Sequence, residues 1–171
     1  PGDIHHVYNK TIDSINLFNT DRDREFFLEL MNECLPEADC HCYSFTLMTN
    51  HYHLILRPGT KGLSKVMQRI NSRYAKYLNS TLKRKGYVFR DRFKSIPTRD
   101  INYVHNLVMY MHANPVRAGM VKSLKELDEY KWSSHKYLTG EENPYSWLKT
   151  DYVKKLFSKW NYYSADNYLN E

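Results

Sequence analysis

One stretch, residues 48–58, limits the architecture of this chain more than any other. It places two histidines, His51 and His53, directly before a short apolar run. Successive side chains of a β-strand point to opposite faces, so the histidines share one face while Tyr52 and Leu54 share the other. Polar imidazoles at the head of a half-buried strand need partners. The pair predicts either two imidazoles that converge on one metal ion or an ordinary surface or core pair, and the pattern alone favours neither.

Strand and helix patterns alternate around this stretch. Strands are expected at residues 4–11, 41–47 and 87–94, and helical spacing of apolar residues covers 19–35, 62–85 and 100–114. Pro36 and Pro115 are expected to end the first and third helices, and Thr49-Asn50 to form a tight turn. A short irregular or helical segment at 130–140 and an amphipathic helix at 151–160 follow. This order predicts an α+β fold with an antiparallel sheet and helices on one side.

Size and charge bound the kind of molecule. The 171 residues, 42% of them hydrophobic, suffice for one domain with a proper core. A net charge of +6 favours a polyanionic partner, and 15 Tyr, 7 Phe and 3 Trp offer rings on which the bases of single strands can stack. No apolar run approaches the ~18 residues of a membrane span and no signal peptide is visible, so a cytoplasmic protein without a membrane partner is expected.

Basic residues gather in two segments. The helix at 62–85 has no acidic residue between Gly62 and Gly86, which fits phosphate contact, although a charged outer face usually serves solvation. In residues 87–94, Phe89 and Phe93 are expected on one face of a strand and the basic side chains on the other. That interleaving suits a nucleic-acid backbone, and an amphipathic strand over a core gives the same pattern.

Two other groups of metal-binding residue types are not expected to form sites. Cys34, Cys40 and Cys42 lack the paired two-residue spacing of common zinc modules and are expected to be reduced thiols. His5 and His6 are adjacent and face opposite ways on a strand. Either could approach the histidine pair, but a solvated strand end is the preferred interpretation.

A later helix carries further candidates. Tyr110 and Asn114 are four residues apart and therefore lie on one helix face. Asn114 can offer its amide oxygen to an ion held by His51 and His53, with the phenol of Tyr110 beside it. Imidazole mixed with hard oxygen ligands suits Mg²⁺ or Mn²⁺. If one of the tyrosines of this helix acts as a nucleophile, Tyr103 is the rival of Tyr110. Tyr110 is preferred, because only Tyr110 has an asparagine four residues after it.

Four motifs in the same order resemble a known family. They are His51-Tyr52-His53 after Met48-Thr49-Asn50, YVFRDRFK at 87–94, YMHANPVRAGMV at 110–121, and Trp132-Ser133-Ser134. Together they resemble the single-tyrosine HUH transposases, named for histidine, bulky hydrophobic, histidine, and most closely their REP-associated tyrosine transposase branch. The likeness covers roughly residues 4–140. Tyr52 stands where the family usually has a smaller apolar residue, and Thr49 where proline is common.

The resemblance implies a ferredoxin-like antiparallel sheet with the histidines on a central strand. It also implies metal-dependent nicking and rejoining of single-stranded or hairpin DNA, in which Tyr110 attacks a phosphorus to leave a 5′-phosphotyrosine and a free 3′-OH. His51 and His53 would be metal ligands, Asn114 the third ligand, and Mg²⁺ or Mn²⁺ the ion. The candidates for DNA contact are Arg57, Lys65, Arg69, Arg73, Arg90, Arg92, Lys94 and Arg117, although each alone is more simply explained as a solvated charge.

Residues 1–140 are assigned to the HUH single-tyrosine transposase domain, and 141–171 to a C-terminal helical extension packed on or beside it. Two alternatives stay open. A rolling-circle replication initiator or relaxase would use the same chemistry but usually carries further domains. A catalytically silent, domesticated DNA-binding protein would keep only the basic and aromatic surface. A monomer and a homodimer with the tyrosine donated in trans are both compatible with the sequence.

Overall fold

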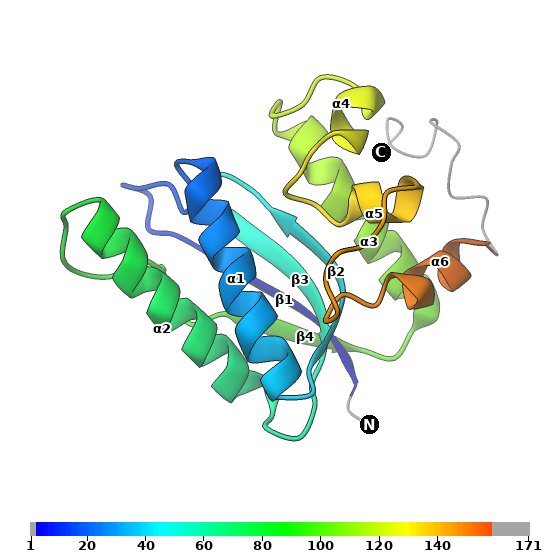
Figure 1. The fold of residues 1–171 in the computed structure, drawn as a ribbon, viewed down its shortest axis with the longest axis horizontal. Coiled ribbons are helices and arrows are strands. Elements are labelled where there is room, and N and C mark those ends of the chain that lie inside the picture. The colour runs from blue at the N-terminus through cyan, green and yellow to red at the C-terminus, as the bar shows by residue number, and fades with distance from the viewer. Residues whose placement is uncertain (1–2, 159–171) are drawn as a thin grey trace.

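The computed structural model describes residues 3–158 (Figure 1). Its elements are β1 (Ile4–Lys10), α1 (Asp21–Glu37), β2 (His41–Leu47), β3 (His51–Arg57), α2 (Leu63–Thr81), β4 (Lys94–Thr98), α3 (Ile101–Arg117), α4 (Leu124–Asp128), α5 (His135–Thr139) and α6 (Thr150–Ser158). The end of the helix expected at 151–160 and the residues after it lie outside the described residues. No helix within residues 3–158 combines the length and apolar character that crossing a bilayer requires.

The four strands form one antiparallel sheet in the order β2-β3-β1-β4. Helix α1 connects β1 to β2, and β3 lies between these two strands in the sheet. After β3 the chain continues through α2 into β4, which pairs with the other side of β1. This arrangement of a β-α-β-β-α-β chain is the ferredoxin-like topology. The predicted α+β fold is therefore confirmed, and the histidine strand is central. Residues 48–50 make the expected turn between β2 and β3.

Alternation along β3 divides the core between the two faces of the sheet. Tyr52 is fully buried on one face, where it meets Phe27 of α1. The long helices α1 and α2 pack against each other across this face (Figure 1). Ile55 points the other way, into a second buried cluster that includes Val108 of α3 and Leu156 of α6. The sheet thus has α1 and α2 on one face, while α3 and α6 cover part of the other.

Pro36 and Pro115, which were expected to end their helices, lie inside them. Helix α1 continues to Glu37 and α3 to Arg117. A proline removes one backbone hydrogen bond and crowds the carbonyl of the preceding turn, but both prolines lie in the last turn of their helices, and Pro115 is also buried in the core. The prediction of both helix ends was therefore wrong. At the start of α3 the Asp100 carboxylate caps the helix by accepting a hydrogen bond from the Asn102 N–H at 2.8 Å.

The prediction of a strand at residues 87–94 is also wrong, because β4 begins only at Lys94. Residues 86–93 form a loop that follows the end of β1, with the Arg90 N–H donating to the Lys10 carbonyl and the Ile12 N–H to the Val88 carbonyl, both at 3.0 Å. Val88 is buried and the charged residues are exposed, so the alternating pattern comes from a loop laid over the core. Helix α2 likewise ends at Thr81 and not at residue 85, because Lys83 takes a left-handed φ of 51°.

Candidate active site

Strand β3 presents His51 and His53 on the sheet face opposite α1 and α2. Their ring centroids are 4.9 Å apart, and His53 is only 7% exposed. The Asn50 amide oxygen lies 2.6 Å from Nδ1 of His51, and an oxygen in this place favours the tautomer that carries its proton on Nδ1. This tautomer leaves Nε2 of His51 with a free lone pair, which is what a metal ion requires.

His6 of β1 completes a buried group of imidazoles. Its Nε2 lies 2.9 Å from Nδ1 of His53, and it is itself only 7% exposed. When His53 donates from Nδ1 to His6, Nε2 of His53 is free to bind a metal, as in many metal sites where a second group orients the ligand. Tyr8, which pairs with His53 across the strands, packs against both rings.

The interpretation of His6 as a solvated strand end was wrong. Strand β1 is a central strand between β3 and β4, so its side chains on the histidine face are covered. His5 points the other way and bonds to Ser95 Oγ at 2.8 Å. The period of two in a strand separates His5 from His6, but it cannot tell which of them faces β3's histidines. That information comes from the register, which pairs Tyr8 with His53.

Burial keeps these imidazoles neutral. It lowers the pKa of His53 to about 3, with the neighbouring histidines adding to the effect, and lowers the pKa of His6 to about 4. Burial and then the Lys10 charge also lower the pKa of His51. At neutral pH all three rings are therefore in the deprotonated form that binds metal.

Helix α3 brings Tyr110 to this group. The Tyr110 ring is 46% exposed and lies 6.1 Å from the His53 ring, at 82° to it. The Arg117 guanidinium lies 5.5 Å from the Tyr110 ring centre. Because α3 extends to Arg117, the helix carries this cation to the same face as the phenol. Tyr103 lies near the start of α3.

Asn114 lies one turn beyond Tyr110 on the same helix. Its Nδ2 is buried and has no hydrogen-bond partner in residues 3–158. Within the same residues, no cluster of three or more His, Cys, Asp or Glu side chains could hold a metal. A metal on the histidine pair would therefore need a donor of another type from the protein. An amide oxygen is such a donor, and its two ends exchange by a half-turn of the side chain. Two imidazoles and an amide fit a divalent ion such as Mg²⁺ or Mn²⁺.

His112 anchors α3 from the opposite side of the helix. Its Nε2 lies 2.9 Å from Ser44 Oγ of β2 and 3.0 Å from Ser134 Oγ, all in the buried interior. Ser134 in turn bonds through Oγ to the Phe45 N–H at 3.0 Å. The Trp132-Ser133-Ser134 motif thus helps to fix α3 against the sheet. The three cysteines lie apart from this chemistry as buried free thiols, as expected.

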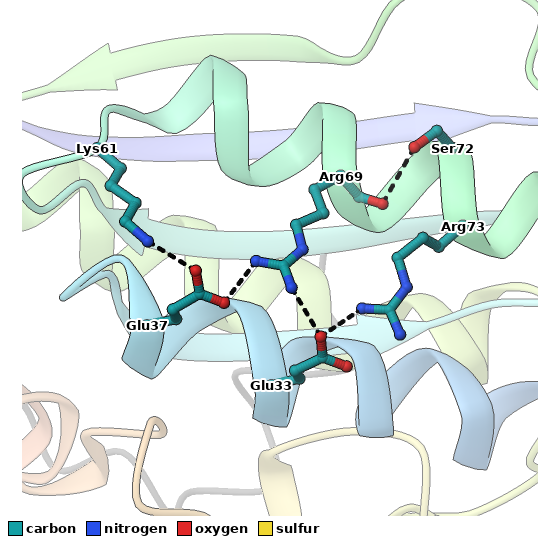
Figure 2. Close-up of polar contacts among 6 residues, drawn as sticks. All are labelled: Glu33, Glu37, Lys61, Arg69, Ser72 and Arg73. Carbon is teal, nitrogen blue, oxygen red and sulfur yellow. Dashed lines mark hydrogen bonds and ion pairs between the residues drawn. The ribbon is translucent and has the colours of Figure 1, made fainter.

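The basic candidates for DNA contact differ in how free their charges are. Figure 2 shows Arg69 bonded to Glu33 and Glu37 of α1, and Arg73 bonded to Glu33. The acids missing from the 62–85 helix are therefore supplied by its neighbour, which the sequence pattern of one helix could not reveal. Other candidates are partly engaged, since Arg90 pairs with Asp13 and Arg57 contacts the His41 ring, whereas Lys65, Arg92 and Lys94 are exposed.

Comparisons with known proteins agree with this geometry. The family described as "Transposase IS200 like" matches residues 4–114. The solved structure of a REP-associated tyrosine transposase bound to a REP hairpin is similar, with a TM-score of 0.67 and 14% sequence identity, over 86% of this chain and 92% of that chain. At this identity the likeness concerns the fold. No match is found among curated proteins. The family match confirms the resemblance to this transposase family, and the structural likeness confirms the fold that it implies.

Proposed function

Since the chain belongs to the IS200-like transposase family, we propose that it nicks and rejoins single-stranded or hairpin DNA through a 5′-phosphotyrosine on Tyr110. The observation that carries the proposal is the contact between the Tyr110 ring and His53 of the same chain. A half-exposed phenol beside neutral, buried imidazoles is placed where a DNA phosphate can reach both. This contact also supports a site completed within one chain, in a monomer or in each half of a homodimer.

The reaction is an exchange of phosphodiesters. The Tyr110 oxygen forms a bond to phosphorus while the bond from phosphorus to the 3′-oxygen breaks. The phenol gives up one proton and the leaving 3′-oxygen takes one up, so neither an oxidant nor an energy donor is needed. Attack by a 3′-OH, from the same or another strand, reverses the exchange, frees Tyr110 and joins the DNA.

His51, His53 and Asn114 are the proposed metal ligands. A bound Mg²⁺ or Mn²⁺ ion would polarise the phosphate. His6 and Asn50 would hold the imidazoles in the tautomers that present Nε2. Arg117, stacked on Tyr110, would place a positive charge beside the phenolate or the phosphate.

The proposed substrate is DNA in hairpin form. The solved structure with a similar fold is bound to a REP hairpin. The net charge of +6 of this chain and its exposed Lys65, Arg92 and Lys94 support a phosphate-rich partner. A protein that nicks and rejoins genomic DNA would act in the cytoplasm.

The test uses a pool of labelled single-stranded hairpin oligonucleotides with Mn²⁺, resolved on a denaturing gel. We expect a protein-linked band from the parent and from the control Tyr103→Phe, and none from Tyr110→Phe. A band that persists in Tyr110→Phe would overturn the assignment of the nucleophile. Hairpin binding without a covalent band in the parent would instead identify a silent DNA-binding protein.

A further inference from the structure

A groove of about 670 Å³ lies between α2 and the loop 86–93, on the sheet face opposite the histidine pair. Tyr52 fixes the side, because it alternates with the two histidines on β3 and its phenol donates to Asn71 Oδ1 in the groove wall at 2.9 Å. The walls relevant to recognition are formed by Gln68, Asn71, Tyr87, Phe89 and Phe93. The chemistry proposed at Tyr110 makes no use of this groove.

Hydrogen bonds hold the outer wall in place. Arg84 donates to the Tyr87 carbonyl oxygen from both terminal nitrogens, at 3.2 and 3.1 Å, and Asn79 donates to the Gly86 carbonyl oxygen at 2.9 Å. Gly86 has φ +104°, which other residues rarely adopt. The Tyr87 ring stands 87% exposed on this fixed turn, so its exposure is built into the fold.

The groove combines flat rings with amides, the two features that recognise an unstacked nucleobase. Tyr87, Phe89 and Phe93 offer aromatic faces for stacking. Asn71 has committed its oxygen to Tyr52 and keeps its amide N–H groups to donate, and exposed Gln68 can both donate and accept. Such amides pair with the edges of bases.

Basic side chains lie beside the groove, where they could contact the phosphates of a nucleotide whose base is bound in it. Arg92 and Lys94 line a second hollow that adjoins the groove at Ser64. Both are exposed, and neither is in an ion pair within residues 3–158, whereas Arg90 is paired with Asp13. The acidic residue that lines this hollow is Asp91. Its backbone carbonyl oxygen accepts a hydrogen bond from the side-chain amide of Asn9 at 3.3 Å.

The same loop leads from the groove to the active site. It continues into β4, where Lys94 pairs with Tyr8, and Tyr8 packs against His53. A strand whose phosphate lies at Tyr110 can therefore pass around this edge of the sheet to the groove. We propose that the groove holds one unstacked nucleotide of the DNA strand that Tyr110 cleaves, with its base against Tyr87 and its phosphates over Arg92 and Lys94. This inference rests on the proposed function.

Photo-cross-linking tests the inference. Single-stranded and hairpin oligonucleotides with 5-iododeoxyuridine at random positions outside the paired stem are bound to the protein, irradiated and mapped by mass spectrometry. We expect cross-links on an aromatic residue of the loop 86–93. Cross-links confined to the Tyr110 face, or hairpin binding without any cross-link to this loop, would contradict the proposal that the groove binds a nucleotide. The covalent Tyr110 band is scored separately, so the groove can fail while the nuclease proposal stands, and the reverse.

Matched variants separate a groove from mere surface contact. Ser72→Trp places a ring in the groove and leaves Tyr87 intact, whereas Ser80→Trp puts the same ring on an exposed position of α2 that does not line it. Only Ser72→Trp should lower the yield of loop cross-links. Tyr87→Ala should weaken binding of a hairpin with a single-stranded extension about tenfold, Tyr87→Phe should not, and a bare hairpin should be unaffected by either. Equal effects on both DNAs would contradict the proposal.

Discussion

At the scale of single residues, the hydrogen bond between His6 and His53 engages Nδ1 of His53 and leaves Nε2 as the nitrogen open to a metal ion. We expect His6→Ala to weaken Mn²⁺ binding by about 10- to 100-fold, because loss of such an orienting partner typically has that effect. The measurement is Mn²⁺ titration followed by electron paramagnetic resonance. The control is His5→Ala, which removes the neighbouring histidine on the opposite strand face. Equal affinity in the parent and both variants would exclude His6 from the metal site.

Residues differ in how far the sequence predicts their role. Tyr110 and Asn114 could be predicted as a pair, because the helical period places positions four apart on one face. His6 could not, because its role depends on how β1 is aligned with β3, and nothing local in residues 4–10 encodes that alignment. The same limit applies to Glu33 and Glu37, whose partners lie on another helix.

At the scale of elements, the ion pairs between α1 and α2 limit how much charge α2 offers to DNA. We expect Glu33→Gln with Glu37→Gln to free Arg69 and Arg73, to tighten binding of single-stranded DNA, and to steepen the salt dependence by about 0.7 per arginine that reaches a phosphate. Affinity measured across a salt series checks this. The control is Glu25→Gln with Glu29→Gln, which changes the net charge equally but affects pairs with Arg22. An equal gain in both variants would mean that only net charge matters.

The same pairs predict a pH dependence. Hydrogen bonds from Arg73 to Glu33 and from Lys61 and Arg69 to Glu37 lower the pKa of both carboxyls from the ordinary 4.5. The unfolded chain therefore binds more protons just below pH 4.5, so this stabilisation is complete above that pH and is lost as pH falls through the lowered values. The melting temperature of the parent should exceed that of the double glutamine variant at pH 6, and the difference should shrink by pH 3.5. A constant difference would contradict this.

The order of elements was more predictable than their ends. Hydrophobic periodicity identified β1, β2, β3 and the three longer helices, because burial on one face imposes it. The loop 86–93 imitated a strand, because its apolar residues also face the core. The two prolines did not end their helices, because each is accommodated in the last turn. Local patterns thus report which side chains are buried, and only the assembled sheet determines how the backbone between them is paired.

At the scale of the whole molecule, α6 contributes to the core under α3. Leu156 is 7% exposed and shares a cluster with Val108 and Ile55. We expect Leu156→Ala to lower the free energy of unfolding by about 2–3 kcal/mol in a single transition that includes the sheet. Urea unfolding followed by fluorescence and circular dichroism measures it, with exposed Lys154→Ala as control. Two separate transitions would show that the C-terminal segment forms its own unit.

The placement of His112 has a consequence for how the site can change over evolution. His112 ties α3 to β2 through Ser44, and the histidine pair stands on β3, so the nucleophile and the proposed ligands are both referenced to one hairpin. Substitutions in α1, in α2 or at the far edge of the sheet can erode stability without moving one half of the site relative to the other. Apart from His6 on β1, the proposed site residues are thereby held to one hairpin, so variation in target choice can accumulate in the rest of the chain separately from variation in chemistry.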